Sequence, residues 1–289
     1  MSRHHGLLGT VIELRIEADT QAAALRIEHQ AIEEIARLQS VFNVYDPDSE
    51  LSRWRRSETE AGPEILEVLG IAERWHDLSE GAFDPYVGRL REVWTDAATE
   101  GRGPGAAELA AARLNRDRSS VDLNGIAKGW IVDRATERAG QERDANGVTV
   151  NGGGDIRHTG PRPLRVAIEN PHRPYNNAAP MAVIELRDGA VATSGGAHRG
   201  WTIGDRRHSH VLDPRTGMPA EGVLQVSVLA PSACVADVVA TALTVVGVDE
   251  REQFLDRMDE SVGYLVGYLI VESNGETDRN QIWENAEVN

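Results

Sequence analysis

Lysine and cysteine are almost absent from this chain of 289 residues, which has one of each. The lone Cys234 excludes an intramolecular disulfide, which fits a reducing compartment or indifference to redox state. No segment approaches the roughly 18 consecutive apolar residues of a transmembrane helix. Residues 1–9 also lack the apolar core of a signal peptide. We therefore expect no transmembrane segment, no lipid-anchor cysteine and a cytoplasmic location.

Positive charge is also scarce, with 30 lysines and arginines against 46 acidic residues and a net charge of −16. A general nucleic-acid surface needs clustered cations, so we expect no nucleic-acid partner. An anionic ligand must instead be held by backbone amides, by one or two cations or by a metal. The same acidity would suit a salt-rich cytoplasm, and the sequence does not distinguish that setting from an ordinary one.

Three common catalytic motifs are missing. The chain has no G-x-S-x-G elbow, no H-E-x-x-H pair and no P-loop, which removes the basis for three hydrolase classes. The glycines of 151–155 (Asn-Gly-Gly-Gly-Asp) do not open a dinucleotide-binding helix, because no helical pattern follows them. They either let a ligand approach the backbone closely or form an open turn.

The composition that is present predicts a packed fold. With 40% hydrophobic residues and no long linker, we expect one elaborated α+β domain over residues 1–272, followed by a polar, frayed tail at 273–289. Glycine and proline in the turns favour a largely antiparallel or mixed sheet flanked by helices. Strands are predicted near 12–16, 148–150, 164–169, 181–186, 190–194, 208–212 and 224–229, with a last strand or hairpin at 262–271. Helices are predicted near 20–40, 63–75, 106–114 and 234–246.

The most informative stretch is 121–133 (Val-Asp-Leu-Asn-Gly-Ile-Ala-Lys-Gly-Trp-Ile-Val-Asp). Its pattern predicts a short strand end at 121–123, a tight turn at 124–125, and a helix with Ile126, Trp130 and Ile131 on one face. Such a junction directs backbone amides and the positive end of a helix dipole at one point, where phosphate binds readily.

Lys128 lies in the first turn of that predicted helix. Every other basic side chain, histidine aside, is arginine, which suggests that this position requires a compact ammonium group and not a planar guanidinium. The alternative is a coding bias that left one lysine in place.

Asp237 and Thr241 lie four residues apart in an apolar helical run, so both oxygens can reach one hard cation. An aspartate there is costly to bury unless it is paired, hydrogen-bonded or bound to metal. A helix-start aspartate with a back-bonded threonine remains the alternative to a metal site.

Two further groups leave alternatives open. On the predicted strand at 208–212 we expect His208 and His210 to face opposite sides of the sheet, and His210 is the better candidate to reach a ligand. Asp213 could equally hold its own turn together. The aromatic side chains around a turn at 46–47 either line a pocket for a flat ring or simply pack: Phe42, Tyr45 and Trp54.

In combination, these stretches resemble the ApbE-like FAD:protein FMN transferase family. The resemblance covers residues 42 to about 246. It rests on Tyr45-x-Pro-x-Ser-Glu-Leu-Ser, Gly-Ala-Phe-Asp-Pro85, Asp-Leu-Asn-Gly-Ile-Ala-Lys-Gly129, Asn-Gly-Gly-Gly-Asp155, Ala-Thr-Ser-Gly195, His-Val-Leu-Asp-Pro-Arg-Thr-Gly217 and Ala-Asp-Val-Val-Ala-Thr241.

The resemblance implies an enzyme that uses Mg²⁺ and cleaves FAD, joins the FMN phosphate to a threonine hydroxyl of an acceptor flavoprotein, and releases AMP. It implies FAD contacts from Phe42, Ala82, Phe83, Asp84, Asn124, Lys128 and His210. It assigns the metal to the Ala127 backbone oxygen and the side chains of Asp237 and Thr241. The catalytic residues it implies are Asp237, His210 and Lys128.

The sequence departs from the family pattern at Phe42, where methionine is frequent, at Asn124, where a second glycine is common, and at 195–198, where an aromatic usually follows. Two other functions stay open at this point. One is a pyrophosphatase that hydrolyses FAD to FMN and AMP, and the other is a flavin-binding protein without catalysis. The acceptor, the oligomeric state and the preferred metal cannot be read from the sequence.

Overall fold

The computed structural model describes residues 1–173, 178–195 and 200–288. The helices are α1 (Gln21–Phe42), α2 (Glu50–Arg55), α3 (Pro63–Leu78), α4 (Gly88–Thr99), α5 (Ala106–Leu114), α6 (Ala127–Gly140), α7 (Ala233–Val245), α8 (Val248–Val262) and α9 (Gln281–Ala286). The strands are β1 (Ser2–Leu7), β2 (Thr10–Ala18), β3 (Ala145–Gly152), β4 (Ile156–Thr159), β5 (Leu164–Ile168), β6 (Ala182–Leu186), β7 (Gly189–Gly195), β8 (Gly200–Ile203), β9 (Arg206–Ser209), β10 (Leu212–Asp213), β11 (Met218–Pro219), β12 (Val223–Ala230), β13 (Gly267–Glu272) and β14 (Thr277–Arg279).

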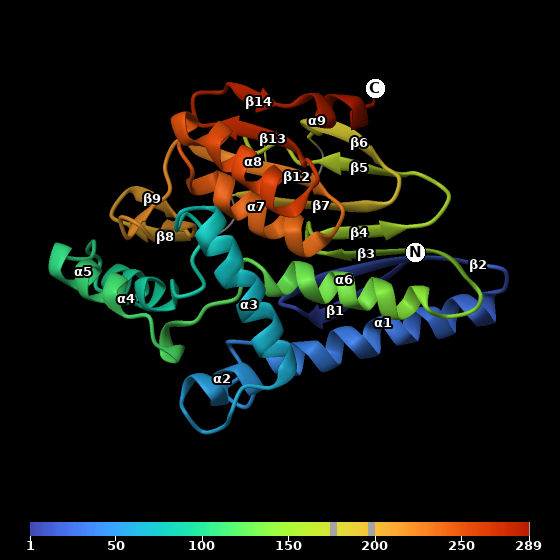
Figure 1. Cartoon of the computed structure of the whole chain (residues 1–289), viewed down its shortest axis with the longest axis horizontal. Helices are drawn as coiled ribbons and strands as arrows, with labels where there is room; N and C mark the ends of the chain where they lie inside the picture. The colour runs from blue at the N-terminus through green and yellow to red at the C-terminus, as the bar shows by residue number, and fades with distance from the viewer. Residues whose placement is uncertain (174–177, 196–199, 289) are drawn as a thin grey trace.

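A central sheet of eight strands runs in the order β1-β2-β3-β4-β7-β12-β13-β14 (Figure 1). Each neighbouring pair in this sheet is antiparallel across the described residues. The crossovers put β4 beside β7 and β7 beside β12, so the sheet joins segments distant in sequence. The predicted α+β class with a largely antiparallel sheet is confirmed.

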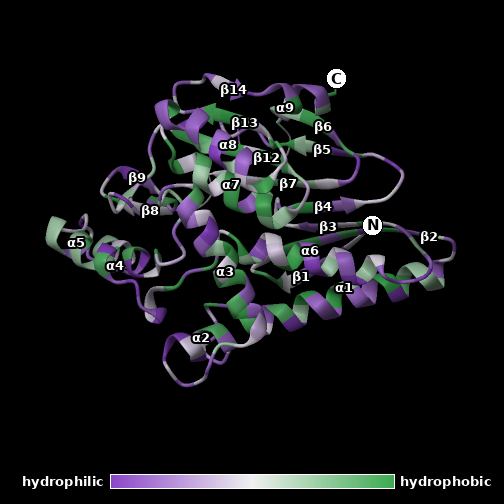
Figure 2. Cartoon of the chain, viewed as in Figure 1, coloured by the Kyte–Doolittle hydropathy of each residue, from purple (hydrophilic) through white to green (hydrophobic). Residues whose placement is uncertain are grey.

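One face of the sheet is covered by α1, α6 and α7, which lie side by side. Strand alternation sends Val226 and Val228 to this side and Leu229 to the other. Helix α1 begins at Thr20, whose side chain accepts a hydrogen bond from the Ala23 amide. Figure 2 shows polar and apolar stretches along α1 but a largely apolar α7, which is the expected difference between an outer helix and a buried one.

The opposite face is covered by the β5–β6 hairpin and α9. Trp283 of α9 is fully buried there, and β14 extends the central sheet beyond β13. The expectation of a frayed C-terminal tail is therefore wrong. The segment is polar in composition, but the buried Trp283 holds it against the sheet. The side chain of Asn280 caps α9. The domain boundary at residue 272 stays a prediction.

Helices α4 and α5 form an arm at one end of the molecule, beside the β8–β9 hairpin (Figure 1). A small separate core fills this arm and includes Trp94, which donates a hydrogen bond to the Gly217 carbonyl over 2.8 Å. The sequence did not predict α4 or α8. It also did not predict β1, which pairs with β2 at the edge of the sheet.

Two predicted strands differ in detail. Residues 121–123 form no strand, because the Asp122 amide donates to the Pro85 carbonyl (2.7 Å) instead of to a sheet neighbour. The strand expected at 208–212 is divided into β9 and β10, with a bend at His210. The opposite-side placement expected for His208 and His210 is wrong. Side chains two residues apart on a regular strand point to the same face, and here the regular strand ends before the bend at His210.

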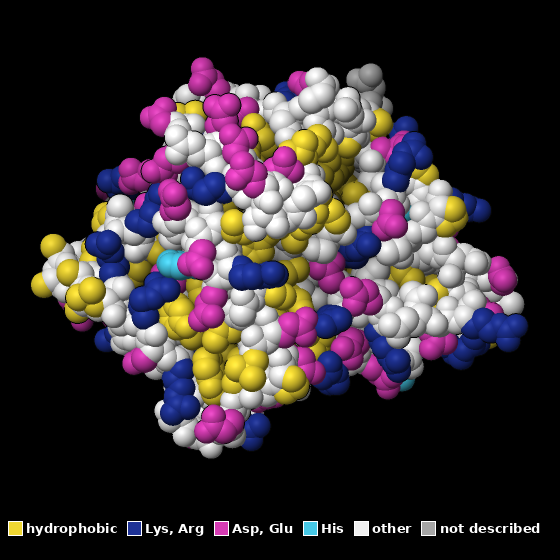
Figure 3. Space-filling model, in the orientation of Figure 1, with side chains coloured by type: hydrophobic (Ala, Val, Ile, Leu, Met, Phe, Trp, Pro, Cys, Tyr) yellow, Lys and Arg dark blue, Asp and Glu magenta, His cyan; other side chains and the backbone are white. Residues whose placement is uncertain are grey.

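No helix among the described residues has the length and apolar character needed to cross a membrane. On the face drawn in Figure 3, acidic and basic side chains are intermixed, and no broad basic patch gathers there.

Candidate active site

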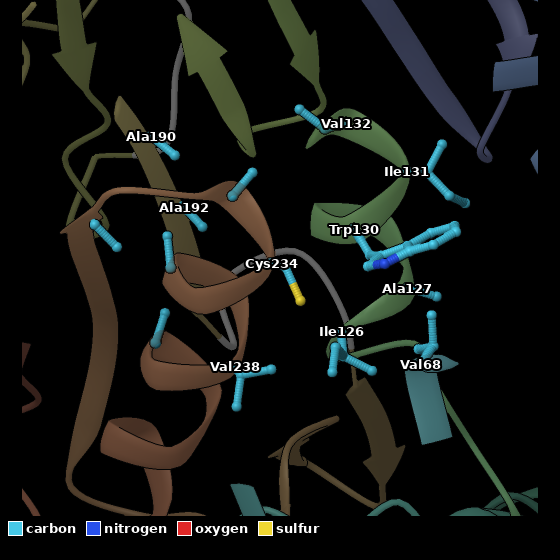
Figure 4. Packing of buried hydrophobic residues seen from close by; sticks show 14 of the residues in the cluster. Val68, Ile126, Ala127, Trp130, Ile131, Val132, Ala190, Ala192, Cys234 and Val238 are labelled. Atoms are coloured by element: carbon cyan, nitrogen blue, oxygen red, sulfur yellow. The ribbon is translucent and has the colours of Figure 1, made fainter. Parts of the chain in front are cut away.

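The site is built around the first turn of α6. The Ile126 and Ala127 amides both donate to the Leu123 carbonyl, which closes the turn that starts the helix. Ile126, Trp130 and Ile131 are all buried, as the 3.6-residue pattern predicted. Figure 4 shows Ile126 at the start of α6 near Cys234 and Val238 of α7, while Ala127 and Trp130 lie on the other side of α6, toward Val68.

The starts of α6 and α7 cross in close contact at Gly129. A Cβ on this glycine would collide with the Ala233 carbonyl oxygen and come within 2.9 Å of the Cys234 Cα. Only a glycine lets the two backbones approach this closely. The crossing therefore brings the amide ends of two helices together, and each amide end attracts negative charge.

An aspartate from α6 caps α7. The two carboxylate oxygens of Asp133 accept hydrogen bonds from the Ala233 and Cys234 amides, each at 2.8 Å. Burial raises the pKa of Asp133 to about 6, although these amides and Arg157, 3.8 Å away, oppose the rise. Burial also raises the pKa of the Cys234 thiol, which keeps it protonated and unreactive.

An aspartate from α7 in turn accepts a hydrogen bond from the start of α6. Asp237 accepts a hydrogen bond from the Gly129 amide in the first turn of α6, at 3.3 Å. It is buried, and burial raises its pKa well above the usual range. The nearby Asp155 carboxyl raises it further, through like charge and a shared hydrogen bond, while Lys128 lowers it.

Lys128 connects this helix to the sheet. Its Nζ lies 2.9 Å from Oδ2 of Asp155, which has only 1% of its side chain exposed, whereas 31% of the lysine side chain is exposed. The turn between β3 and β4 holds Asp155 in place, because the Asp155 carbonyl accepts a hydrogen bond from the Gly152 amide at 2.8 Å. Two buried carboxyls and one ammonium thus meet at the start of α6.

Asp155 is the residue that sequence reasoning missed as a site residue. The sequence did mark Asp155, since it ends the Asn-Gly-Gly-Gly-Asp run, but it did not show that Lys128 would be its partner in the fold. The glycines themselves are explained by contacts within the protein. A Cβ at Gly152 would press on Val132 at 2.8 Å, and Gly153 has a positive φ of 70° beside Thr10.

Thr241 faces the turn that precedes α6. A Cβ on Gly125 would lie 3.4 Å from the Thr241 hydroxyl oxygen and 3.2 Å from the ring of Phe83. The structure therefore brings the turn at 124–125, the helix α7 and the loop at 81–85 together at one place. Asp237 and Thr241 share a face of α7, as their spacing predicted.

The loop that carries Ala82, Phe83 and Asp84 is fixed by its own contacts. The Phe83 amide donates to the Ser79 hydroxyl at 2.9 Å, and its carbonyl lies 3.2 Å from His76 Nδ1. Asp84 accepts from Arg116 at 2.6 Å and from the Tyr86 amide at 2.9 Å. Ala82 and Phe83 are buried.

A cleft of about 670 Å³ opens beside this loop. Its walls come from the end of α3, from α5 and from the turn after β10. Residues of both signs line it: His76, Asp77, Glu80, Asp84, Arg113, Arg116 and Arg215.

Other predicted residues lie at varied positions. Phe42 packs edge-on against Trp130, with ring centroids 5.6 Å apart, whereas Tyr45 is exposed, so these two aromatics do not share one wall. Asn124 is exposed at the turn before α6. Asp213 holds its own turn, since its carboxylate accepts from the Arg215 amide at 2.9 Å, as one of the two readings anticipated.

His210 lies at the bend between β9 and β10, next to Gly200 of β8. Its place relative to Lys128 and Asp237 stays a prediction. The departure noted at 195–198 falls mostly on residues 196–199, which lie outside the described residues.

The donors at this site suit a small hard cation that also binds a substrate. Within residues 1–173, 178–195 and 200–288, no three His, Cys, Asp or Glu side chains gather as a metal cluster. Mg²⁺, however, commonly uses one or two carboxylates and completes its shell with water and substrate phosphates. Asp237 and Thr241 therefore fit such an ion, and the Ala127 carbonyl lies in the adjoining first turn of α6.

Comparison with known proteins identifies the family of this chain. The family model described as the ApbE family matches residues 8–266. The FAD:protein FMN transferase of Vibrio cholerae is 35% identical over 244 residues, which cover 73% of this chain and 70% of that protein. The protein of the same name from Haemophilus influenzae is 29% identical over 279 residues, covering 85% and 79%.

Solved structures show the same fold. The ApbE protein of Thermotoga maritima superposes with a TM-score of 0.83 at 29% identity, covering 100% of this chain and 99% of that one. The flavin transferase ApbE of Vibrio cholerae superposes with a TM-score of 0.75 at 25% identity, covering 99% and 98%. With a matching family model over most of its length and this shared fold, the chain belongs to the ApbE family.

Proposed function

We propose that this chain is a transferase that moves FMN from FAD to a threonine hydroxyl of an acceptor flavoprotein, depends on Mg²⁺ and releases AMP. The observation that carries the proposal is the meeting of Asp237, Asp155 and Lys128 at the amide end of α6. Buried like charges are costly to a fold, and they occur where a ligand or a reaction needs them. The names of the relatives supply the reaction.

The first turn of α6 supplies a place for phosphate. Amides at a helix start and the ammonium of Lys128 both favour an anion, and the lysine side chain is partly exposed. Once a metal offsets the two buried carboxyls, this point would attract a pyrophosphate, although the chain as a whole is strongly acidic. The loop of Ala82, Phe83 and Asp84 and the exposed Asn124 would contact the rest of FAD.

Asp237, Thr241 and the Ala127 carbonyl would hold the metal. When bound, Mg²⁺ would neutralise charge that develops on the phosphate oxygens. Lys128 acts on the same charge from the α6 side, since an ammonium costs no reorganisation if it already points at the site. Burial beside a second carboxyl explains why Asp237 would gain from a cation.

The transfer needs a base near the phosphate. The threonine oxygen forms a bond to the FMN phosphorus, the bond from that phosphorus to the AMP oxygen breaks, and the hydroxyl proton must leave. We assign the proton to His210, because a neutral imidazole within reach of the threonine hydroxyl can act as a general base. Water in place of the threonine hydroxyl would give FMN and AMP, which is the pyrophosphatase alternative.

One incubation separates the candidate functions. The protein is mixed with FAD, Mg²⁺ and a peptide that carries an acceptor threonine, and the peptide is followed by mass spectrometry while AMP is followed by chromatography. Transfer adds FMN to the peptide with equimolar AMP, and hydrolysis gives AMP and free FMN alone. FAD binding without either product would identify a flavin carrier and contradict the proposal.

A matched pair of variants tests the site itself. Asp237→Asn removes the anionic ligand and keeps the shape, whereas Asp133→Asn makes the same change one helix crossing away. We expect the first to abolish transfer and the second to retain it. Equal loss in both would indicate that the helix crossing, and not the metal, had been disturbed.

A further inference from the structure

The Lys128–Asp155 pair raises a question about charge that the proposed function leaves open. The ammonium of Lys128 lies 2.9 Å from a carboxylate that is itself beside Asp237. A divalent cation held by Asp237 would be close to that ammonium and would be repelled by it. The lysine and the metal are therefore alternative partners for the same negative charge.

The two members of the pair differ in their freedom to move. Asp155 is almost fully buried in the turn between β3 and β4, and the Gly152 amide donates to its carbonyl. Lys128 has a flexible stem and keeps nearly a third of its side chain exposed. If the pair opens, the lysine moves toward solvent and Asp155 stays in the site.

We propose that Lys128 is an internal counter-ion that occupies Asp155 when no ligand is bound, and that it gives up this carboxylate to the divalent cation when a phosphate takes over the ammonium. The inference rests on the proposed function, since it uses the same metal and the same phosphate. It adds that Asp155 is part of the metal's anionic surroundings. It also makes Lys128 the residue that couples metal binding to nucleotide binding.

The coupling has a direction that can be measured. A phosphate-bearing ligand that neutralises Lys128 must raise the affinity for the metal, and by linkage the metal must raise the affinity for that ligand by the same factor. Without a nucleotide, the ammonium opposes the metal. Removing its charge should then improve metal binding even though it harms transfer.

The first test measures Mn²⁺ affinity without FAD, from the free-ion electron paramagnetic resonance signal. Lys128→Met keeps the length of the stem and removes the charge, and we expect it to bind Mn²⁺ roughly tenfold tighter than the wild type. Asp155→Asn added to Lys128→Met should remove that gain.

Arg91→Met is the matched control. Arg91 pairs with the half-buried Asp122 at 3.3 Å and has 29% of its side chain exposed, so the variant loses one charge from a similar ion pair. We expect unchanged Mn²⁺ affinity, because salt screens a charge that does not contact the site. If Arg91→Met raised Mn²⁺ affinity as much as Lys128→Met, the change would follow from the net charge of the protein alone, and the proposal would be overturned.

A second test needs no variant, because the chain contains a single lysine. Protein grown with ¹³C-lysine gives side-chain NMR signals from Lys128 alone. Saturating Mg²⁺ should displace the ammonium from Asp155 even without a nucleotide, because the two cations compete for one carboxylate, and the Cε signal should shift in step with metal binding. A signal that stays fixed at saturating Mg²⁺, or a Lys128→Met variant that binds Mn²⁺ no tighter, rejects the inference.

These results are separable from the proposed function. If the wild-type protein labels the acceptor peptide but its Lys128 signal does not change with Mg²⁺, the transferase function is supported and the counter-ion role of Lys128 is rejected. A protein whose Lys128 signal follows Mg²⁺ but that labels no peptide would support the counter-ion role of Lys128 and contradict the transferase function.

Discussion

Asp133 and Asp237 lie on neighbouring helices, and each reaches across to amides that begin the other helix. The two carboxylates differ in the number of hydrogen bonds they accept and in the charges beside them. Both oxygens of Asp133 accept short bonds from backbone amides, and Arg157 is the nearest cation. Asp237 accepts one longer bond and has a second carboxyl beside it.

We propose that this difference separates a structural aspartate, Asp133, from a functional one, Asp237. A helix cap gives both oxygens of its carboxylate hydrogen-bond partners within the fold, although burial still raises the pKa of Asp133. Two carboxyls buried together leave negative charge that one lysine does not neutralise. The position of excess charge, and not burial alone, marks the site. The predictions below test this contrast.

The largest expected effect concerns the two carboxylates directly. Asp237→Asn should lower kcat/KM for FMN transfer by roughly 10²- to 10³-fold or more, because the anionic ligand of the metal is lost. Asp133→Asn should stay near the wild type in transfer. Initial rates at limiting Mg²⁺ measure both, and near-normal activity in Asp237→Asn would exclude its assignment as a metal ligand.

Substitutions of Lys128 test whether the cation beside these carboxyls must be an ammonium. We expect Lys128→Arg to be almost as damaging as Lys128→Ala, with about 10²-fold loss in kcat/KM at saturating Mg²⁺, because a guanidinium cannot occupy the same point beside the turn. Thermal melts would confirm folding. An arginine variant with wild-type rates would mean that any cation suffices and would favour coding bias as the origin of the lone lysine.

The pH dependence of stability reports on Asp133. Its pKa is raised from 3.8 to about 6 in the folded protein, so the native state binds more protons than the unfolded state between those values. This group therefore stabilises the fold at pH 4 relative to pH 7, by up to roughly 3 kcal/mol, and the contribution is lost as the pH rises through about 6.

Asp133→Asn should remove this part of the slope in urea unfolding measured from pH 4 to pH 7. The variant and the wild type are compared by the slope, since the amide also changes the cap. An unchanged slope would show that Asp133 titrates alike in the folded and unfolded chain.

The smallest effect tests the crossing that both aspartates share. Gly129→Ala should cost about 1–3 kcal/mol of stability, since its Cβ would overlap the Ala233 carbonyl. Gly140→Ala, at the end of the same helix with no atom within 4 Å of the added Cβ, is the control and should be neutral or slightly stabilising. Equal melting temperatures for the two variants would contradict the close crossing.

The sequence predicted those parts of the fold and site that depend on local patterns. Helix α6 and the shared face of Asp237 and Thr241 follow from spacing along one helix. The meeting of Asp155 with Lys128 could not be read in this way, because it depends on how the β3–β4 turn is placed beside α6. The C-terminal tail failed for a related reason, since Trp283 is buried by strands distant in sequence.

The reciprocal caps also bear on how the protein folds. The Asp133 bonds join residues 100 and 101 positions apart, and the Asp237 bond joins residues 108 positions apart. Contacts of such separation carry a large loop-closure cost and form only after much of the sheet between them is in place. The site therefore forms only when chain segments about 100 residues apart have been brought together. A chain released before residue 237 has been synthesised lacks the carboxylate that reaches the Gly129 amide, so it cannot form the helix crossing that both caps share.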